Sequence, residues 1–148
     1  MEITKVFFEY LRNNDLKITP ERITILNEVL KIDKHFEANT LFLHLLTDNI
    51  KISRATIYRT LELLVDCGLV KKIHFGKTGW FYEPNIEPKS HDHFLCTNCG
   101  KIIEFYDNEL NLIHKKFADE NKLIVNDYSH QLYGKCSECM TEKIESGN

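Results

Sequence analysis

The chain has 148 residues, 43% of them hydrophobic and 28% charged, which is the composition of a soluble globular protein with a buried core. No apolar stretch is long enough to cross a bilayer, and no basic segment precedes an apolar run at the N-terminus, so we expect a cytoplasmic protein. A net charge of −3 excludes blanket affinity for nucleic acid, although residues 1–84 carry 12 basic against 11 acidic residues and residues 85–148 carry 7 against 11.

Three amphipathic helices are predicted in the first third of the chain. The apolar residues at helical spacing, expected to face inward, are Ile3, Val6, Phe7, Tyr10 and Leu11, then Ile23, Leu26, Val29 and Leu30, then Leu41, Phe42, Leu45 and Leu46. The second helix has a defined start, because Thr19 is suited to cap it and Pro20 to occupy its first position. Each helix has one apolar stripe, so the three need one another to fold.

A fourth helix, over 54–67, is predicted after Ser53, which is a suitable N-cap. Its inner face is apolar, whereas Tyr58 and Arg59 are expected on its exposed early turns. Two short strand-like runs follow within 69–83 and flank a Gly-Lys-Thr-Gly hairpin loop. This order describes a winged helix-turn-helix, in which the fourth helix would enter the major groove and the hairpin would lie along the DNA backbone.

The polar, proline-containing segment 85–90 is predicted to be a linker between two domains. After it we expect a strand over 91–96, a strand over 101–106, a helix from about 108 and a last strand over 123–133. The tail over 141–148 is expected to fray. The predicted fold class is α+β, with a winged helix-turn-helix DNA-binding domain at 1–84 and a small dimerisation and metal-binding domain at 91–148.

Metal-binding side chains concentrate between His91 and Cys99. Cys96 and Cys99 form one Cys-x-x-Cys pair, and Cys136 and Cys139 form a second. Two such pairs can present four thiolates to one tetrahedral ion, which suits zinc better than a disulfide or plain burial. Two metal-type pairs and one remaining cysteine also suit a reducing compartment.

A second metal site is indicated by His91 and His93. Residues two apart in a strand point to the same face, so both imidazoles can reach one ion, with Asp92 on the opposite face. Histidines combined with carboxylates suit iron, manganese or zinc. The competing interpretation is that the two histidines are structural.

Three longer motifs stand out: Ala-Thr-Ile-Tyr-Arg-Thr-Leu at 55–61, His-Asp-His-Phe-Leu-Cys-Thr-Asn-Cys-Gly-Lys-Ile-Ile-Glu-Phe at 91–105, and Tyr-Gly-Lys-Cys at 133–136. Together they resemble the ferric uptake regulator (Fur) family of metal-dependent bacterial repressors, over nearly the whole chain. The resemblance implies a homodimer that binds a double-stranded DNA operator and represses transcription when its regulatory ion is present.

The resemblance also implies roles for individual residues. The structural zinc ligands of the family are matched by Cys96, Cys99, Cys136 and Cys139. Its regulatory site, for Fe²⁺ or Mn²⁺, is matched by His35, Glu83, His91, His93 and Glu104. Its groove-reading positions are matched by Tyr58 and Arg59, and candidates for phosphate contacts are Lys17, Arg22 and Lys77.

A mechanism follows from this resemblance. His35 and Glu83 belong to the DNA-binding half and the other regulatory ligands to the second half, so one ion would bridge the two. Binding of the ion would favour the hinge angle at which both recognition helices of the dimer fit successive major-groove faces.

Two departures from the family pattern bear on the signal. Peroxide-sensing members have Asp where this chain has Glu104, which favours iron sensing; peroxide sensing by iron-catalysed histidine oxidation and zinc sensing are the alternatives. An additional metal site of some relatives is matched by Ser90, Asp92, Asn111 and Tyr128, which retain one good ligand, so we expect that site to be absent or weak.

Two other classes of zinc protein were weighed against a regulator. A zinc hydrolase or deaminase needs a His-Glu-x-x-His helix or a His-x-Glu motif, and the sequence has neither, so we expect no enzyme activity. Four thiolates also leave no open position for water. A zinc-dependent protein-interaction module would leave Tyr58, Arg59 and the hairpin without a role.

Overall fold

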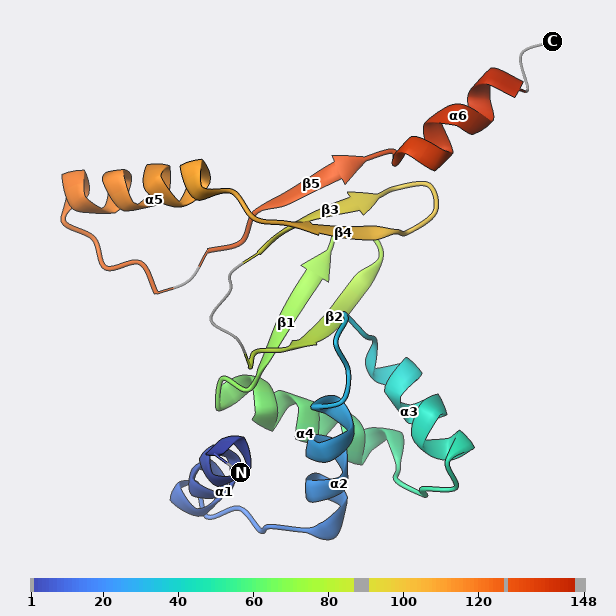
Figure 1. Cartoon of the computed structure of the whole chain (residues 1–148). Helices are drawn as coiled ribbons and strands as arrows, with labels where there is room; N and C mark the ends of the chain where they lie inside the picture. Colours follow the sequence, from blue (N-terminus) through green and yellow to red (C-terminus); the bar gives the residue numbers. More distant parts are fainter. Residues whose placement is uncertain (1, 87–90, 127, 146–148) are drawn as a thin grey trace. The chain divides into compact units, whose positions relative to one another are not determined.

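The computed structural model describes residues 2–86, 91–126 and 128–145, with side chains up to 141 in the last segment. The chain divides into two compact units, Met1–Pro88 and Lys89–Asn148 (Figure 1). Within the predicted linker 85–90, residues 87–90 lie outside the described part of the chain. No helix among the described residues is long and apolar enough to cross a membrane.

The first unit has the predicted order of helices followed by a hairpin. Its elements are α1 (Glu2–Asn13), α2 (Pro20–Val29), α3 (Ala38–Thr47), α4 (Arg54–Asp66), β1 (Val70–Phe75) and β2 (Gly79–Pro84). The two strands pair antiparallel from Val70 opposite Pro84 to Phe75 opposite Gly79, and Figure 1 shows them extending from the helices as a wing. The unit is a winged helix-turn-helix.

Two predicted helix caps are confirmed. The Thr19 hydroxyl accepts the backbone N–H of Arg22 at 3.4 Å, and Pro20 begins α2. The Ser53 hydroxyl accepts the N–H of Thr56 at 3.1 Å and so begins α4. Each bond satisfies a backbone donor that has no partner inside its helix.

The structure buries the central residues of the predicted apolar stripes but differs from the prediction at some of their edges. Leu41 and Leu45 of α3 are buried, but Leu46, predicted inward, is 50% exposed because one residue further along a helix lies about 100° around its axis. Ile25 of α2, absent from the predicted stripe, is fully buried. The stripe of α2 is therefore wider than periodicity predicts, because the helix contacts more than one neighbour.

The second unit is a small α+β domain, so the α+β fold class is confirmed. Its elements are β3 (Asp92–Cys96), β4 (Ile102–Phe105), α5 (Asn108–Asn121), β5 (Gln131–Gly134) and α6 (Ser137–Glu145). β3 is the central strand, antiparallel to β4 and parallel to β5.

Two predictions for this unit are wrong. The last strand, predicted over 123–133, is limited to Gln131–Gly134. The tail, predicted to fray over 141–148, is helical as far as Glu145, and residues 146–148 lie outside the described residues. Its helix begins at the second cysteine pair, where the N–H of Met140 donates to the carbonyl oxygen of Cys136 at 3.0 Å, so the metal-binding turn itself starts α6.

The second unit has little apolar core of its own. Its buried cluster consists of Cys96, Cys136 and Cys139, with Phe94 packed against it. In contrast, α5 and the segment after it expose large apolar side chains: Leu112 (65%), Ile113 (60%), Phe117 (57%) and Ile124 (91%). Figure 1 shows α5 extending away from the three-stranded sheet of its unit.

Candidate functional site

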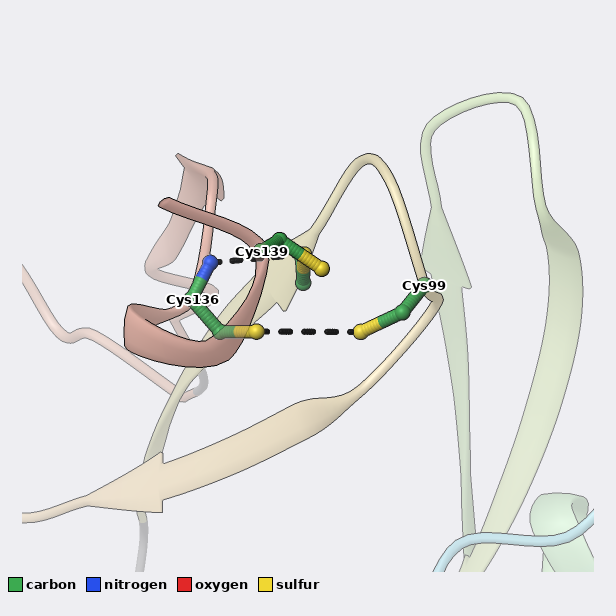
Figure 2. A group of neighbouring side chains, drawn as sticks. Cys99, Cys136 and Cys139 are labelled. Atoms are coloured by element: carbon green, nitrogen blue, oxygen red, sulfur yellow. Dashed lines mark hydrogen bonds between the residues drawn. The ribbon is translucent and has the colours of Figure 1, made fainter. Parts of the chain in front are cut away.

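The two cysteine pairs meet in one cluster in the second unit. Cys96 is the last residue of β3 and Cys99 lies in the turn that follows. Cys136 directly precedes α6 and Cys139 lies in its first turn, and Figure 2 shows the side chains of both facing Cys99. The four sulfur atoms lie within 4.8 Å of one another, and the sulfurs of Cys99 and Cys136 are 3.7 Å apart. Thiolates bound tetrahedrally at about 2.3 Å from a zinc ion are separated by about 3.8 Å, so this spacing fits zinc.

Hydrogen bonds orient the thiol groups of the cluster. The backbone N–H of Cys136 donates to the sulfur of Cys96 at 3.3 Å, and the side-chain amide of Asn98 donates to the sulfur of Cys139 at 3.3 Å. Hydrogen bonds from the backbone N–H groups of Cys99 and Cys136 lower the pKa of the Cys96 thiol to about 6. Such bonds favour the thiolate, which is the form that binds a metal.

A salt bridge joins the two turns that bear the cysteines. The ammonium of Lys101, just after the first pair, lies 2.8 Å from the carboxylate of Glu138, between the cysteines of the second pair. The backbone of Thr97 adds a second connection by donating to the carbonyl oxygen of Gly134 at 2.7 Å. The ends of β3 and β5 are therefore held together beside the cluster.

In the first unit, His35 and Glu83 form a pair of metal-type side chains. Phe36 and Tyr82 exchange two backbone hydrogen bonds, of 3.0 and 2.8 Å, in an isolated β-bridge. The bridge brings the Nε2 of His35 to 3.4 Å from a carboxylate oxygen of Glu83. The His35 ring packs edge-on against Phe75, with centroids 5.8 Å apart, which restricts its rotation.

In the second unit, β3 and β4 bring together His91, His93 and Glu104. His93 and Glu104 are direct partners in the antiparallel register. The Nε2 of His91 lies 3.8 Å from a carboxylate oxygen of Glu104, and the two imidazole centroids are 5.6 Å apart. Asp92 is 3% exposed, and one of its oxygens lies 3.9 Å from the Nδ1 of His130.

A basic hollow of about 440 Å³ lies where α2 and α4 begin. Its lining includes Arg22, Lys51 and Arg59, the acidic Glu21, and the hydroxyl groups of Ser53 and Thr56. Helix N-termini attract anions through the helix dipole, and three cationic side chains against one carboxylate strengthen that attraction. The hollow is therefore suited to a phosphate group.

The other predicted DNA contacts lie around this hollow or on the wing. The backbone carbonyl of Lys17 accepts a hydrogen bond from the guanidinium of Arg22. Tyr58 is 48% exposed on α4. Lys77 is exposed in the β1–β2 turn. Of the predicted set, the structure brings Arg22 and Arg59 together, and Tyr58 and Lys77 do not line the hollow.

Comparison with known proteins identifies the family. A model of the ferric uptake regulator family matches residues 13–133. The chain belongs to this family. It is 34% identical over 141 residues to the ferric uptake regulation protein of Campylobacter jejuni, a match that covers 94% of this chain and 89% of the relative. The chain is therefore a metal-responsive, DNA-binding transcription regulator.

Two further members of the Fur family are similar to the chain. The peroxide-responsive repressor PerR of Staphylococcus saprophyticus is 31% identical over 129 residues, covering 87% of this chain and 86% of the relative. The crystal structure of the ferric uptake regulator of Vibrio cholerae has 34% sequence identity and a TM-score of 0.71, covering 86% of this chain and 98% of that one. Its description reports a structural rearrangement of the DNA-binding domains.

The structure also describes Asp92, Asn111 and Tyr128, three of the four positions at which we expect an additional metal site to be absent or weak. The hydroxyl of Tyr128 donates to the side-chain oxygen of Asn111 at 2.8 Å, and the His114 ring lies 4.5 Å from the Tyr128 ring, centroid to centroid. Ser90, the remaining polar position beside Asp92, lies outside the described residues.

Two features of this Fur-family chain were missed in the sequence. Lys51 lines the basic hollow, and its position just before the Ser53 cap was the available signal. On α3, the Nε2 of His44 lies 3.6 Å from Asp48 and 3.8 Å from Glu28 of α2. Lys31, at 2.6 Å from Glu28, already offsets that carboxylate, so we interpret the group as surface ion pairing.

Proposed function

We propose that this Fur-family regulator is a homodimeric transcriptional repressor that binds a double-stranded DNA operator when Fe²⁺ or Mn²⁺ occupies its regulatory site. The winged-helix domain at 1–84 binds the operator and the domain at 91–148 forms the dimer. Zinc at Cys96, Cys99, Cys136 and Cys139 is structural, because four thiolates fill its coordination sphere and leave no site for an exchanging ligand.

The observation that supports the regulatory site is the presence of an incomplete ligand set in each unit. His35 and Glu83 offer two ligands, while His91, His93 and Glu104 offer three. Nitrogen and carboxylate ligands together suit Fe²⁺ and Mn²⁺, which take more ligands than either unit supplies alone. We propose that one ion draws ligands from both units and so fixes the angle between them.

The angle between the units then controls operator binding. With the ion bound, the two recognition helices of the dimer are held at the spacing of successive major grooves; without it, the angle is free. A preference of about 1.4 kcal/mol between the two states changes operator affinity about tenfold. The rearranged DNA-binding domains described for the V. cholerae relative support a movable angle in this fold.

The exposed apolar residues of the second unit support the homodimer. Leu112, Ile113 and Phe117 are each more than half exposed on α5. An apolar face of this extent on a unit with a small core is typical of a surface covered by another subunit. A second copy of the chain is the partner that a symmetric regulator requires.

Peroxide sensing is a second candidate, supported by the similarity to the S. saprophyticus PerR repressor. In that case His35 or His93, as ligands of bound iron, would gain one oxygen atom from hydrogen peroxide, whose other oxygen atom would leave as water. The iron-loaded protein is exposed to peroxide and its peptides are analysed by mass spectrometry. Oxidised His35 or His93 supports peroxide sensing, and unmodified peptides support plain metal sensing.

Operator binding tests the proposed function directly. Protein with zinc only at the four cysteines is titrated onto an operator duplex in parallel with Fe²⁺, Mn²⁺ and Zn²⁺, and the affinity is measured by fluorescence anisotropy. We expect Fe²⁺ or Mn²⁺ to raise the operator affinity at least tenfold. An equal affinity with and without every ion would contradict a metal-dependent repressor, and a response to Zn²⁺ alone would assign zinc sensing.

A further inference from the structure

Three side chains connect the wing to the recognition helix α4. The ammonium of Lys72, on β1, lies 2.6 Å from the Oε1 atom of Glu62, on α4. The hydroxyl of Tyr82, on β2, donates to the same oxygen at 3.0 Å. One carboxylate oxygen of α4 therefore binds both strands of the wing, and we call these three residues the Glu62 clamp.

Aromatic contacts and burial hold the Glu62 clamp in place. The Lys72 ammonium lies over the ring of Trp80, 4.8 Å from its centroid, and 5.8 Å from that of Tyr82. Tyr82 is only 2% exposed, whereas the Glu62 side chain that it contacts is 45% exposed, so the clamp lies at the edge of the core. Removing a hydrogen bond to a charged acceptor costs more than removing one to a neutral acceptor.

The clamp is also in the protonation state that its hydrogen bonds require. The hydrogen bond from Lys72 lowers the pKa of the Glu62 carboxyl, so this group remains an acceptor at neutral pH. Near neutral pH the clamp therefore stays closed.

Tyr82 also anchors the backbone that bears both regulatory ligands of the first unit. Glu83 follows Tyr82 directly in β2, and His35 precedes Phe36, whose backbone exchanges two hydrogen bonds with Tyr82. The Phe36 and Tyr82 rings stack with centroids 5.9 Å apart and planes 29° apart. Tyr82 thus contacts, on one side, the backbone that bears the proposed metal ligands His35 and Glu83. On the other side, its hydroxyl contacts the recognition helix α4.

We propose that the Glu62 clamp transmits binding of the regulatory ion to the recognition helix. This inference rests on the proposed function, in which His35 and Glu83 bind that ion. When the ion fixes the Tyr82 backbone, the clamp makes α4 and the wing follow as one rigid body. Without the clamp, the ion would still bind and fix the backbone of β2, but it would have a smaller effect on the position of α4.

If the clamp only stabilises the fold, its removal changes operator affinity in a different way than if the clamp transmits ion binding. A structural contact changes operator affinity by the same factor with and without the ion. A transmitting contact changes the ratio of the two affinities, which measures the coupling between ion and operator. Because coupling is reciprocal, loss of transmission also lowers ion affinity in the operator complex while leaving it unchanged in free protein.

Tyr82→Phe is the decisive variant, because it removes one hydroxyl and keeps the ring that stacks on Phe36. Tyr10→Phe is its matched control. The Tyr10 hydroxyl donates to the carboxylate of Asp66, which is also on α4, at 3.5 Å, but Tyr10 lies on α1 and not on the wing. Glu62→Gln is a second test, because it removes the charge that holds Lys72. Zinc content and thermal unfolding verify that each variant is folded.

We measure operator affinity of the full-length protein with and without Mn²⁺ by fluorescence anisotropy, and Mn²⁺ affinity with and without operator. We expect the factor by which Mn²⁺ increases operator affinity to be roughly threefold to tenfold smaller in Tyr82→Phe than in the wild type, which is about the net contribution of one ordinary hydrogen bond. Glu62→Gln should behave likewise, Tyr10→Phe should match the wild type, and Mn²⁺ affinity without DNA should stay unchanged.

The possible outcomes separate the clamp from the proposed function. If the wild type gains no operator affinity with Mn²⁺, Fe²⁺ or Zn²⁺, the proposed function fails and the clamp has no signal to transmit. If the wild type responds and Tyr82→Phe responds equally, the clamp alone is refuted. An equal loss with and without the ion in Tyr82→Phe, or the same reduced response in Tyr10→Phe, also refutes it.

Discussion

We propose that all four cysteines of the cluster are needed, because a zinc ion bound there would be held by four thiolates. We expect Cys96→Ser to lose about one zinc ion per chain and to unfold the second unit, because the substitution removes both a ligand and the acceptor of the Cys136 N–H. Cys67→Ser is the control: Cys67 donates to the Leu64 carbonyl at 3.5 Å, a bond that serine keeps, and lies outside the cluster. Metal analysis and circular dichroism check both. Full zinc content in Cys96→Ser would contradict the assignment.

The carboxyl of Glu62 makes stability depend on pH in a defined direction. Its pKa in the folded protein is lowered by Lys72 from an ordinary value of 4.5, so the stabilisation is present above 4.5 and is lost as the pH falls through the folded-state pKa. Glutamine cannot titrate. We therefore expect the wild type to unfold at a higher temperature than Glu62→Gln at pH 7, and the difference to disappear once the pH falls below the lowered folded-state pKa of Glu62. A difference that stays constant over this range would show that Lys72 does not pair with the charged form.

At the scale of elements, we propose that α4 and the segment just before it make two kinds of DNA contact, which substitution can separate. We expect Arg59→Ala to weaken binding to the specific operator by about 1–3 kcal/mol, because a groove-reading arginine discriminates bases. Lys51→Ala should weaken binding to all duplexes alike and reduce the salt dependence by about one ion, because Lys51 lines the phosphate-sized hollow. Lys5→Ala, on exposed α1, is the control. Anisotropy titrations over a salt series make the comparison, and a wild-type affinity in Arg59→Ala would place α4 outside the groove.

Local signals in the sequence were enough to predict the helices of the first unit. Caps such as Thr19 and Ser53, and apolar periodicity, determine helices through contacts a few residues apart, so these were predicted with small errors. The cysteine spacing likewise implied a shared ion before any geometry was known. In contrast, the apolar run after α5 has the pattern of a strand but pairs with none in the described chain, because Lys122 ends the helix in a left-handed conformation and the chain turns away.

The pairings that position the regulatory ligands could not be predicted from the residues. His35 approaches Glu83 only because Phe36 and Tyr82, which are far apart in the sequence, form a β-bridge. No periodicity within either segment encodes that pairing; only the family resemblance selected the two residues. The Glu62 clamp was missed for the same reason, since its members come from three elements.

At the scale of the whole molecule, the α5 face is expected to carry the dimer. We predict that Phe117→Asp, which places a charge on a residue 57% exposed in the single chain, yields a monomer that keeps its zinc. Its operator affinity should fall at least tenfold, because one recognition helix replaces two. Lys116→Asp, at the neighbouring exposed position, should remain dimeric. Light scattering measures the mass of both variants, and a dimeric Phe117→Asp would move the interface elsewhere.

The regulatory mechanism requires that ligands from both units bind one ion, and a double-mutant comparison tests this requirement. If His35 and His93 share an ion, either His35→Ala or His93→Ala should weaken Mn²⁺ binding by at least tenfold, and the double variant should be little worse than either single one, because the shared site is already broken. If each histidine belonged to a separate site, each single variant would instead keep one intact site and the losses would add. Isothermal titration calorimetry on zinc-loaded protein gives both the affinity and the number of ions. One regulatory Mn²⁺ per chain with non-additive losses supports a bridging ion, and two independent Mn²⁺ sites would leave the angle between the units uncontrolled by metal.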